Sequence, residues 1–228
     1  MMTYYIITIL FGLLGKMASG KLQSRFKEYS AMPTESGLSG KEIAEKMLRD
    51  SGITDVKVVS VKGALTDHYN PSNKTVNLSD WVYDQRNVAA TAVAAHEVGH
   101  AVQHANSYTW LTMRSKMVPA VQFSSKIMMF VIMGGLAVSF FSGNPIVLGI
   151  GVAMFAGTTL FSIVTLPVEY DASDRALAWM NTSGVVGPQQ HGYAEDALKW
   201  AARTYVVGAI ASIGQLVYFL SLFMGSRR

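Results

Sequence analysis

The chain has 228 residues, of which 50% are hydrophobic and 15% are charged, and its formal net charge is +4. A typical soluble domain carries roughly 25% charged residues, so this composition indicates a membrane protein with one polar domain. The chain has no cysteine, which excludes disulfides and thiolate metal ligands, and the membrane interpretation accounts for the positive charge without a nucleic-acid partner.

The first predicted element is a short apolar segment at the N-terminus. Residues 1–15 are uncharged, and positive residues follow them from Lys16 onward. A secretory signal would carry its positive charges before the apolar core rather than after it. This order predicts an uncleaved membrane anchor over residues 1–17, with the N-terminus outside the cell and the following flank in the cytoplasm.

A polar domain is predicted over residues 18–117. Ser39 and Glu42 fit a capping box that begins a helix over residues 41–50. Residues 56–62 and 74–79 are rich in β-branched side chains and predict two strands. Asn87 is the expected N-cap of a long, alanine-rich helix over residues 87–105.

Three apolar runs follow, and each is long enough to cross a membrane: residues 118–141, 145–166 and 204–225. Residues 142–144 join the first two runs into a tight helical hairpin, and residues 167–203 form a polar segment with helical character. Residues 16–117 hold 13 Lys and Arg, residues 167–203 hold 3, and the hairpin loop holds none. Both polar segments are therefore expected on the cytoplasmic side.

The chemistry of the chain is carried by HEVGH at residues 96–100, inside the predicted alanine-rich helix. Residues four apart lie on one helix face, about 6 Å apart along the axis, so His96 and His100 can bind one zinc ion. In H-E-x-x-H motifs the glutamate, here Glu97, acts as general base toward a water that zinc activates. The motif predicts a metallopeptidase site.

Two histidines do not complete a zinc shell, and the other histidines are poor candidates for a third ligand. His104 lies about 12 Å from His96 along a straight helix, beyond a metal held by His96 and His100. Metallopeptidases that use a nearby third histidine have a glycine turn before it, which is missing here. His68 and His191 are better interpreted as polar surface residues.

A better third ligand lies in LPVEYDASDRAL at residues 166–177, where a predicted span returns to the cytoplasmic side. A helix beginning at Pro167 would carry Glu169 in its first turn, and this carboxylate is the one nearest the membrane edge. A carboxylate beside an apolar span is costly without a partner. Asp171 and Asp174 compete with Glu169 for this role. Two histidines and a carboxylate leave one open position for water, as in catalytic zinc sites.

The segments DHYNPSNKTVNLS, AVAAHEVGHAVQHA and LPVEYDASDRALAWM together resemble the YugP-type family of putative neutral zinc metallopeptidases, which are membrane gluzincins. A more distant likeness is to the HtpX-type and CAAX prenyl endopeptidases. The resemblance implies that Glu169 is the third zinc ligand. The chain departs from the distant pattern at Ser173, which replaces an aspartate, so that Ser173 or Asp174 would orient a ligand histidine.

The resemblance also implies a mode of substrate binding. An edge strand beside the active-site helix would pair with an extended substrate, and residues 75–79, with Asn77 among them, are the candidate strand. The oxyanion of the transition state needs a hydrogen-bond donor or a cation. Candidates for this role are Arg175, Tyr170, His191 and Tyr193.

These observations predict a mainly α integral membrane protein with about four transmembrane helices and a small α+β, zincin-like cytoplasmic domain. Its segments are an anchor (1–17), the catalytic domain (18–117), a transmembrane hairpin (118–166), a helical segment with the third ligand (167–203) and a C-terminal transmembrane helix (204–228). The expected function is a zinc metalloendopeptidase of the cell inner membrane, with one Zn²⁺ and its active site facing the cytoplasm. The expected partners are membrane-associated protein or peptide substrates and the lipid bilayer.

The alternative is a non-catalytic membrane scaffold or adaptor with a structural zinc. Glu97 argues against it, because a purely structural site needs no general base. A metal transporter is less favoured, because it would need ionisable residues within its spans, and these hold only Lys126 near one end.

Overall fold

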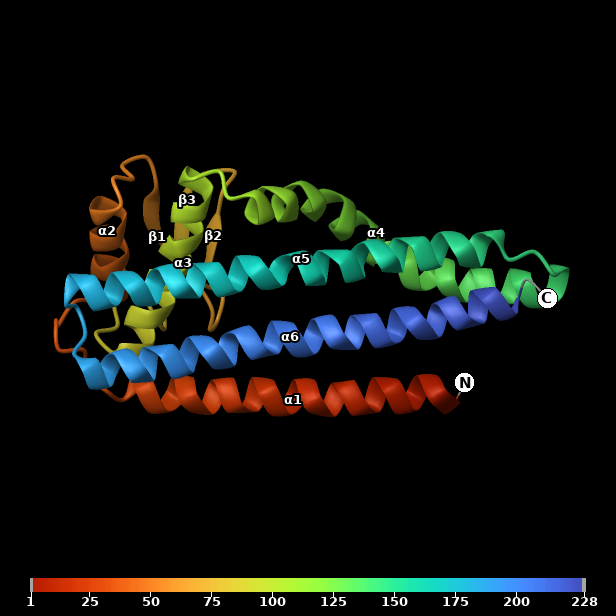
Figure 1. Cartoon of the computed structure of the whole chain (residues 1–228), viewed down its shortest axis with the longest axis horizontal. Helices are drawn as coiled ribbons and strands as arrows, with labels where there is room; N and C mark the ends of the chain where they lie inside the picture. The colour runs from red at the N-terminus through yellow and green to blue at the C-terminus, as the bar shows by residue number, and fades with distance from the viewer. Residues whose placement is uncertain (1, 227–228) are drawn as a thin grey trace. The chain divides into compact units, whose positions relative to one another are not determined.

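A computed structural model describes residues 2–226 of the chain (Figure 1). Met1, Arg227 and Arg228, which belong to the predicted first and last segments, lie outside the described residues. The chain divides into two compact units. We call Ala18–Thr112 with Pro167–Arg203 the polar unit, and Met1–Met17, Met113–Leu166 and Thr204–Arg228 the membrane unit.

The chain is mostly helical, with one small sheet. Its elements in order are α1 (Met2–Ser30), α2 (Gly40–Asp50), β1 (Lys57–Val61), β2 (His68–Asn70), β3 (Thr75–Ser79), α3 (Val88–Ala105), α4 (Thr109–Ser142), α5 (Ile146–Ser183) and α6 (Pro188–Gly225).

Local capping chemistry sets the first residues of two helices in the polar unit, as predicted. The Ser39 hydroxyl accepts the Glu42 N–H at 3.3 Å, and the Glu42 carboxylate accepts the Ser39 N–H at 2.7 Å, which completes the capping box of α2. Asn87 caps α3, because its side-chain oxygen accepts the Ala90 N–H at 2.8 Å. Both caps satisfy N–H groups that have no partner within the helix.

The sheet has three strands in the order β1-β3-β2, with β1 parallel and β2 antiparallel to β3. The two strands expected from the sequence are present, but β2 was not predicted. Because β2 covers the second side of β3, the expectation that residues 75–79 form an edge strand is wrong. Asn77 of β3 is buried, and its amide donates to the His68 carbonyl oxygen of β2 at 3.2 Å.

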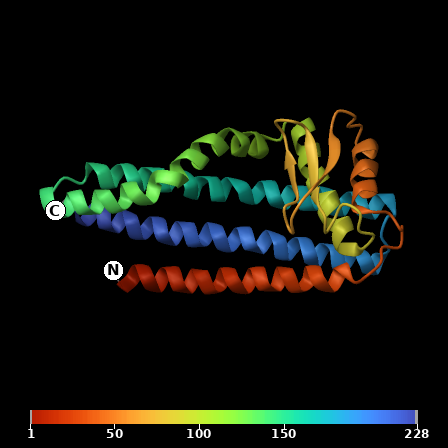
Figure 2. The same cartoon turned by 180° about the vertical axis from the view of Figure 1, so that it is seen from behind.

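The core of the polar unit surrounds α3, which lies against α2 and the sheet (Figure 2). Helix α2 contributes one apolar face, and its four core residues are at most 3% exposed: Ile43, Ala44, Met47 and Leu48. Helix α3 contributes mainly alanines and valines, and β3 contributes Val76 and Leu78. The small side chains of α3 let its neighbours approach closely, so this helix is fixed on several sides.

The first and last helices also meet within the polar unit. The Tyr29 hydroxyl of α1 donates to Asp196 of α6 at 2.7 Å, and the Arg25 guanidinium pairs with the same carboxylate at 3.1 Å. The Tyr29 ring stacks on Tyr193 with centroids 5.2 Å apart. These contacts join the end of α1 to the beginning of α6, which lie side by side in both views (Figures 1 and 2).

In the membrane unit, α4, α5 and α6 are, among the described residues, long and apolar enough to cross a membrane. Gly135 lets α4 pack directly against the backbone of Leu148 in α5. The expectation of a helix that begins at Pro167 is wrong, because α5 continues through this residue. Helix α4 contains the apolar run 118–141 and begins at Thr109. An apolar helix tolerates an interior proline, because neighbouring groups can satisfy the freed backbone oxygen.

Candidate metal centre

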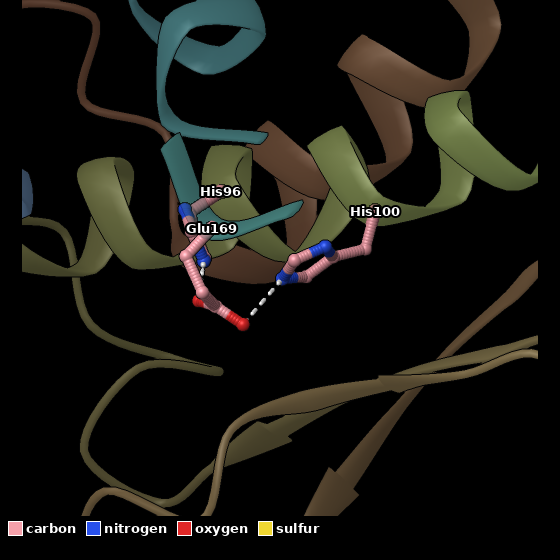
Figure 3. A group of neighbouring side chains, drawn as sticks. All are labelled: His96, His100 and Glu169. Carbon is pink, nitrogen blue, oxygen red and sulfur yellow. Dashed lines mark ion pairs between the residues drawn. The ribbon is translucent and has the colours of Figure 1, made fainter. Parts of the chain in front are cut away.

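Three side chains of the polar unit converge on one point, two from α3 and one from α5. His96 and His100 lie one turn apart on α3, and the Glu169 carboxylate points toward both rings (Figure 3). His96 Nε2 lies 3.3 Å from Glu169 Oε2, and His100 Nε2 lies 3.8 Å from Glu169 Oε1. One nitrogen or oxygen from each residue lies within 4.8 Å of the others.

This arrangement fits a zinc ion. Ligand atoms about 2.1 Å from a tetrahedral zinc lie about 3.4 Å from one another. The separations of the two imidazole nitrogens from the two carboxylate oxygens of Glu169, 3.3 and 3.8 Å, are close to that value. Two neutral imidazoles and one carboxylate are also ligand types that zinc prefers, and three of them leave a fourth position open.

Gly99 lets the two ligand-bearing helices approach each other. A Cβ atom at this position would lie 2.5 Å from the carbonyl oxygen of Ala172 in α5, which is too close for any side chain. The contact lies between His96 and His100 in sequence on one helix, and between Glu169 and Ser173 on the other. The glycine of HEVGH therefore brings the carboxylate ligand within reach of the histidines.

Each ligand histidine has a polar neighbour on its second ring nitrogen. His96 Nδ1 lies 3.1 Å from the Ser173 hydroxyl, so the serine that replaces the aspartate of the distant pattern contacts the first histidine of the motif. Asp174, the alternative for that contact, is exposed. His100 Nδ1 lies 3.0 Å from Gln103 Oε1. Gln103 was not singled out from the sequence, although its i, i+3 spacing from His100 places it near that face of the helix.

Glu97 is buried beside the ligand cluster. Burial raises the pKa of Glu97 to about 7, and the carboxylates of Glu169 and Asp67 add to this rise. The charge of His96 and a hydrogen bond from the backbone of Tyr69 in β2 lower the pKa of Glu97 and oppose this rise. A carboxylate with a pKa near neutrality is suited to accept and return a proton at neutral pH.

One of the competing carboxylates, Asp171, has other partners. Asp171 is held by Arg175, whose guanidinium contacts its two oxygens at 2.6 and 3.2 Å. Among the described residues, the group placed to hold one metal contains Glu169 and neither Asp171 nor Asp174. Arg175, one of the oxyanion candidates, is thus engaged in an ion pair with Asp171 in this structure.

The remaining histidines and tyrosines named from the sequence lie outside that ligand group. His68 Nδ1 contacts the Thr66 carbonyl oxygen at 2.8 Å, and His191 Nε2 contacts the Leu177 carbonyl oxygen at 3.1 Å. Tyr170 is 44% exposed, and Tyr193 stacks on Tyr29.

His104 lines a separate cavity in the polar unit. Its Nδ1 lies 2.7 Å from the Tyr69 hydroxyl. The two side chains border a cavity of about 310 Å³ together with Asp55 and Lys74, which form an ion pair with each other, and with apolar residues that include Ala101. The backbone of the same Tyr69 contacts Glu97, the predicted general base.

Comparisons with known proteins match the chain to a family of zinc peptidases. Residues 4–224 match a family described as putative neutral zinc metallopeptidases. The chain is 37% identical over 226 residues to a protein of Bacillus subtilis (strain 168) named putative membrane protease YugP, and the match covers 99% of both chains. No solved structure matches the chain significantly.

Proposed function

The chain belongs to the putative neutral zinc metallopeptidase family, and from this premise we propose that it is a membrane-bound zinc metalloendopeptidase of the gluzincin type. His96, His100 and Glu169 hold one Zn²⁺, and Glu97 is the general base. The observation that carries this proposal is the convergence of three zinc-type ligands from two helices beside a buried glutamate. A structural zinc site would not need that glutamate.

The chain's own residues divide the remaining work. Zinc held at this site would supply a Lewis acid for the scissile carbonyl and would lower the pKa of water. Glu97 takes a proton from the attacking water and passes it to the leaving amine. The Tyr69 backbone holds the Glu97 carboxylate in place, and the Ser173 hydroxyl supports the ring of His96.

The proposed setting is the inner membrane of the cell. Helices α4, α5 and α6 supply three spans, and the apolar first part of α1 is the proposed fourth, with its N-terminus outside. The zincin-like catalytic domain then lies on the cytoplasmic side, where the positive-inside rule places its Lys and Arg residues. Glu169 follows the proposed span over residues 145–166 by three positions, so the metal site would lie near the membrane surface.

The proposed substrates are membrane-associated proteins or peptides that reach this surface. We propose that the cavity bordered by Tyr69 and His104 receives a substrate side chain. Its polar wall, formed by a phenol, an imidazole and an ion pair, suits a polar side chain better than a large apolar one.

The test measures zinc content and peptide cleavage together in detergent-purified protein. We expect wild type and Glu97→Gln to hold one zinc per chain, and Glu169→Gln to lose it after mild chelation. Cleavage of a quenched fluorescent peptide library should fall 10²–10⁴-fold in Glu97→Gln, the usual contribution of a general base. Glu45→Gln, at a half-buried glutamate of α2 that pairs with Lys41, is the control.

Three results would contradict the proposal in different ways. Undiminished cleavage by Glu97→Gln would show that Glu97 is not the general base. Unchanged zinc affinity in Glu169→Gln would move the third ligand elsewhere. Stoichiometric zinc in wild type without cleavage of any peptide or membrane protein would favour the scaffold with a structural zinc.

A further inference from the structure

Gln103 is a fully buried amide in a helix rich in alanine and valine, and it lies about one turn after His100. A primary amide has two N–H donors on one side and an acceptor oxygen on the other. A buried amide is costly unless both sides are satisfied. The structure satisfies both, and it does so with groups from α5 as well as α3.

The partners of Gln103 decide which way its amide faces. Its Nε2 lies 2.8 Å from the Val168 carbonyl oxygen and 2.7 Å from Asp171 Oδ2. Arg175 donates to both oxygens of Asp171, so they act as acceptors. Only the NH₂ group of Gln103 can donate to these two acceptors. A reversed amide would place its oxygen next to the Val168 carbonyl oxygen and Asp171 Oδ2, where no hydrogen bond can form. The Oε1 atom therefore faces His100.

This orientation determines where the proton of His100 lies. Gln103 Oε1 is 3.0 Å from His100 Nδ1 and can only accept a hydrogen bond. His100 Nδ1 must then carry the hydrogen, which leaves the lone pair of the neutral ring on Nε2. That nitrogen is the one that faces Glu169, at 3.8 Å from Oε1.

We propose that Gln103 is the positioning residue of the metal site: held by Val168 and Asp171, its amide fixes His100 as the Nδ1–H tautomer and aims Nε2 at the metal. The inference rests on the proposed zinc function and adds to it a residue outside the ligand set. It also assigns a role to Asp171 and Arg175: Arg175 binds Asp171, and Asp171 accepts a hydrogen bond from the Gln103 amide that orients His100.

His96 has a different kind of neighbour on its Nδ1 atom. Its Nδ1 neighbour is the Ser173 hydroxyl, which can donate or accept and so selects neither tautomer. Of the two histidines, His100 is therefore the one whose tautomer the protein sets through an amide of fixed direction. Loss of Gln103 should affect metal binding more than loss of the Ser173 hydroxyl.

The test compares Gln103→Met with Gln189→Met in the full-length, detergent-purified protein. Methionine keeps the length of the side chain and removes both polar ends. Gln189 is an exposed amide on α6 that donates to Tyr193, and it serves as the matched control. Zinc affinity is measured by competition with a chromophoric chelator. We expect Gln103→Met to bind zinc 10–100-fold more weakly, the usual effect of losing a group that orients a metal ligand, and Gln189→Met to match wild type.

Two further measurements separate positioning from folding. Thermal unfolding of the zinc-free Gln103→Met variant beside wild type shows whether the variant keeps its fold while it loses zinc affinity. In the zinc-free protein at pH 8, a ¹⁵N spectrum of the five labelled histidines should show His100 as the Nδ1–H tautomer in wild type and a mixture of tautomers in Gln103→Met.

Equal zinc affinity in Gln103→Met and wild type would overturn the inference and leave the proposed function standing. An Nε2–H tautomer for His100 in wild type would overturn it as well. Zinc-free wild-type protein that binds no added zinc would instead contradict the proposed function, while the tautomer spectrum would still decide the hydrogen-bonding role of Gln103.

Discussion

At the scale of single residues, the site depends on one position without a side chain. Gly99 meets the carbonyl oxygen of Ala172 at a place where a Cβ atom would be 2.5 Å away. The backbone of α5 cannot yield as a flexible side chain would. A methyl group here would push the helix that carries Glu169 away from the helix that carries the histidines.

We therefore expect Gly99→Ala to destabilise the polar unit by about 1–3 kcal/mol, the usual range for overpacking a tight interior contact. It should also weaken zinc binding, because the separation between the ligands increases. Thermal unfolding and chelator competition measure the two effects. Gly192→Ala is the matched control, since the same methyl group there meets open space on a helix and should be neutral or slightly stabilising. Equal behaviour of the two variants would contradict the packing argument.

The sequence pointed to the residues of the site whose chemistry is local. The spacing of His96 and His100 and the glutamate between them follow from one helical turn, and Glu169 was favoured because a carboxylate at a membrane edge needs a partner. Two contacts were missed, because no local pattern reveals them. Gln103 depends on partners in α5, and the backbone of Tyr69 reaches Glu97 from β2. The metal-binding roles of His96, His100 and Glu169 and the catalytic role of Glu97 stay predictions.

At the scale of elements, the helix beginnings were predictable and the connections between elements were not. Ser39 and Asn87 cap α2 and α3 through groups within three residues of each other, so short-range chemistry suffices. Strand β2 has three residues, too few to show an alternating pattern, and its pairing with β3 depends on a turn between them. Pro167 suggested a helix boundary, but α5 continues through it.

The contribution of the α3 N-cap to stability can be measured. We expect Asn87→Ala to lower the free energy of unfolding of the polar unit by about 1 kcal/mol, because the Ala90 N–H loses its acceptor. Asn87→Ser should retain most of the stability, because serine is an equally good cap. Zinc stoichiometry should be unchanged in both variants, since Asn87 lies more than two turns before His96. A loss of zinc in Asn87→Ala would show that fraying of the helix reaches the ligands.

At the scale of the whole molecule, the distribution of charge and the absence of cysteine make the membrane topology directly testable. Ser142 adjoins the hairpin loop, and Ser72 lies in the turn between β2 and β3; both are exposed. Because the natural sequence has no cysteine, replacing either serine with cysteine gives a chain with a single thiol.

We expect Ser142→Cys to react with a membrane-impermeant maleimide in intact cells, and Ser72→Cys to react only after the cells are permeabilised. This result follows if the polar unit faces the cytoplasm and the hairpin loop faces outward. The unmodified, cysteine-free chain controls for background labelling. The reverse pattern would place the catalytic domain outside the cell.

The pairing of α3 with α5 across the hairpin has a consequence for biosynthesis. His96 and Ser173, which touch in the folded protein, are 77 residues apart in the chain, and two apolar runs are translated between them. A ribosome that has released HEVGH has therefore not yet made its carboxylate partner. If the proposed site is correct, the nascent enzyme is inert until its hairpin has been delivered to the bilayer, and the order of translation alone protects the ribosome's surroundings from premature proteolysis.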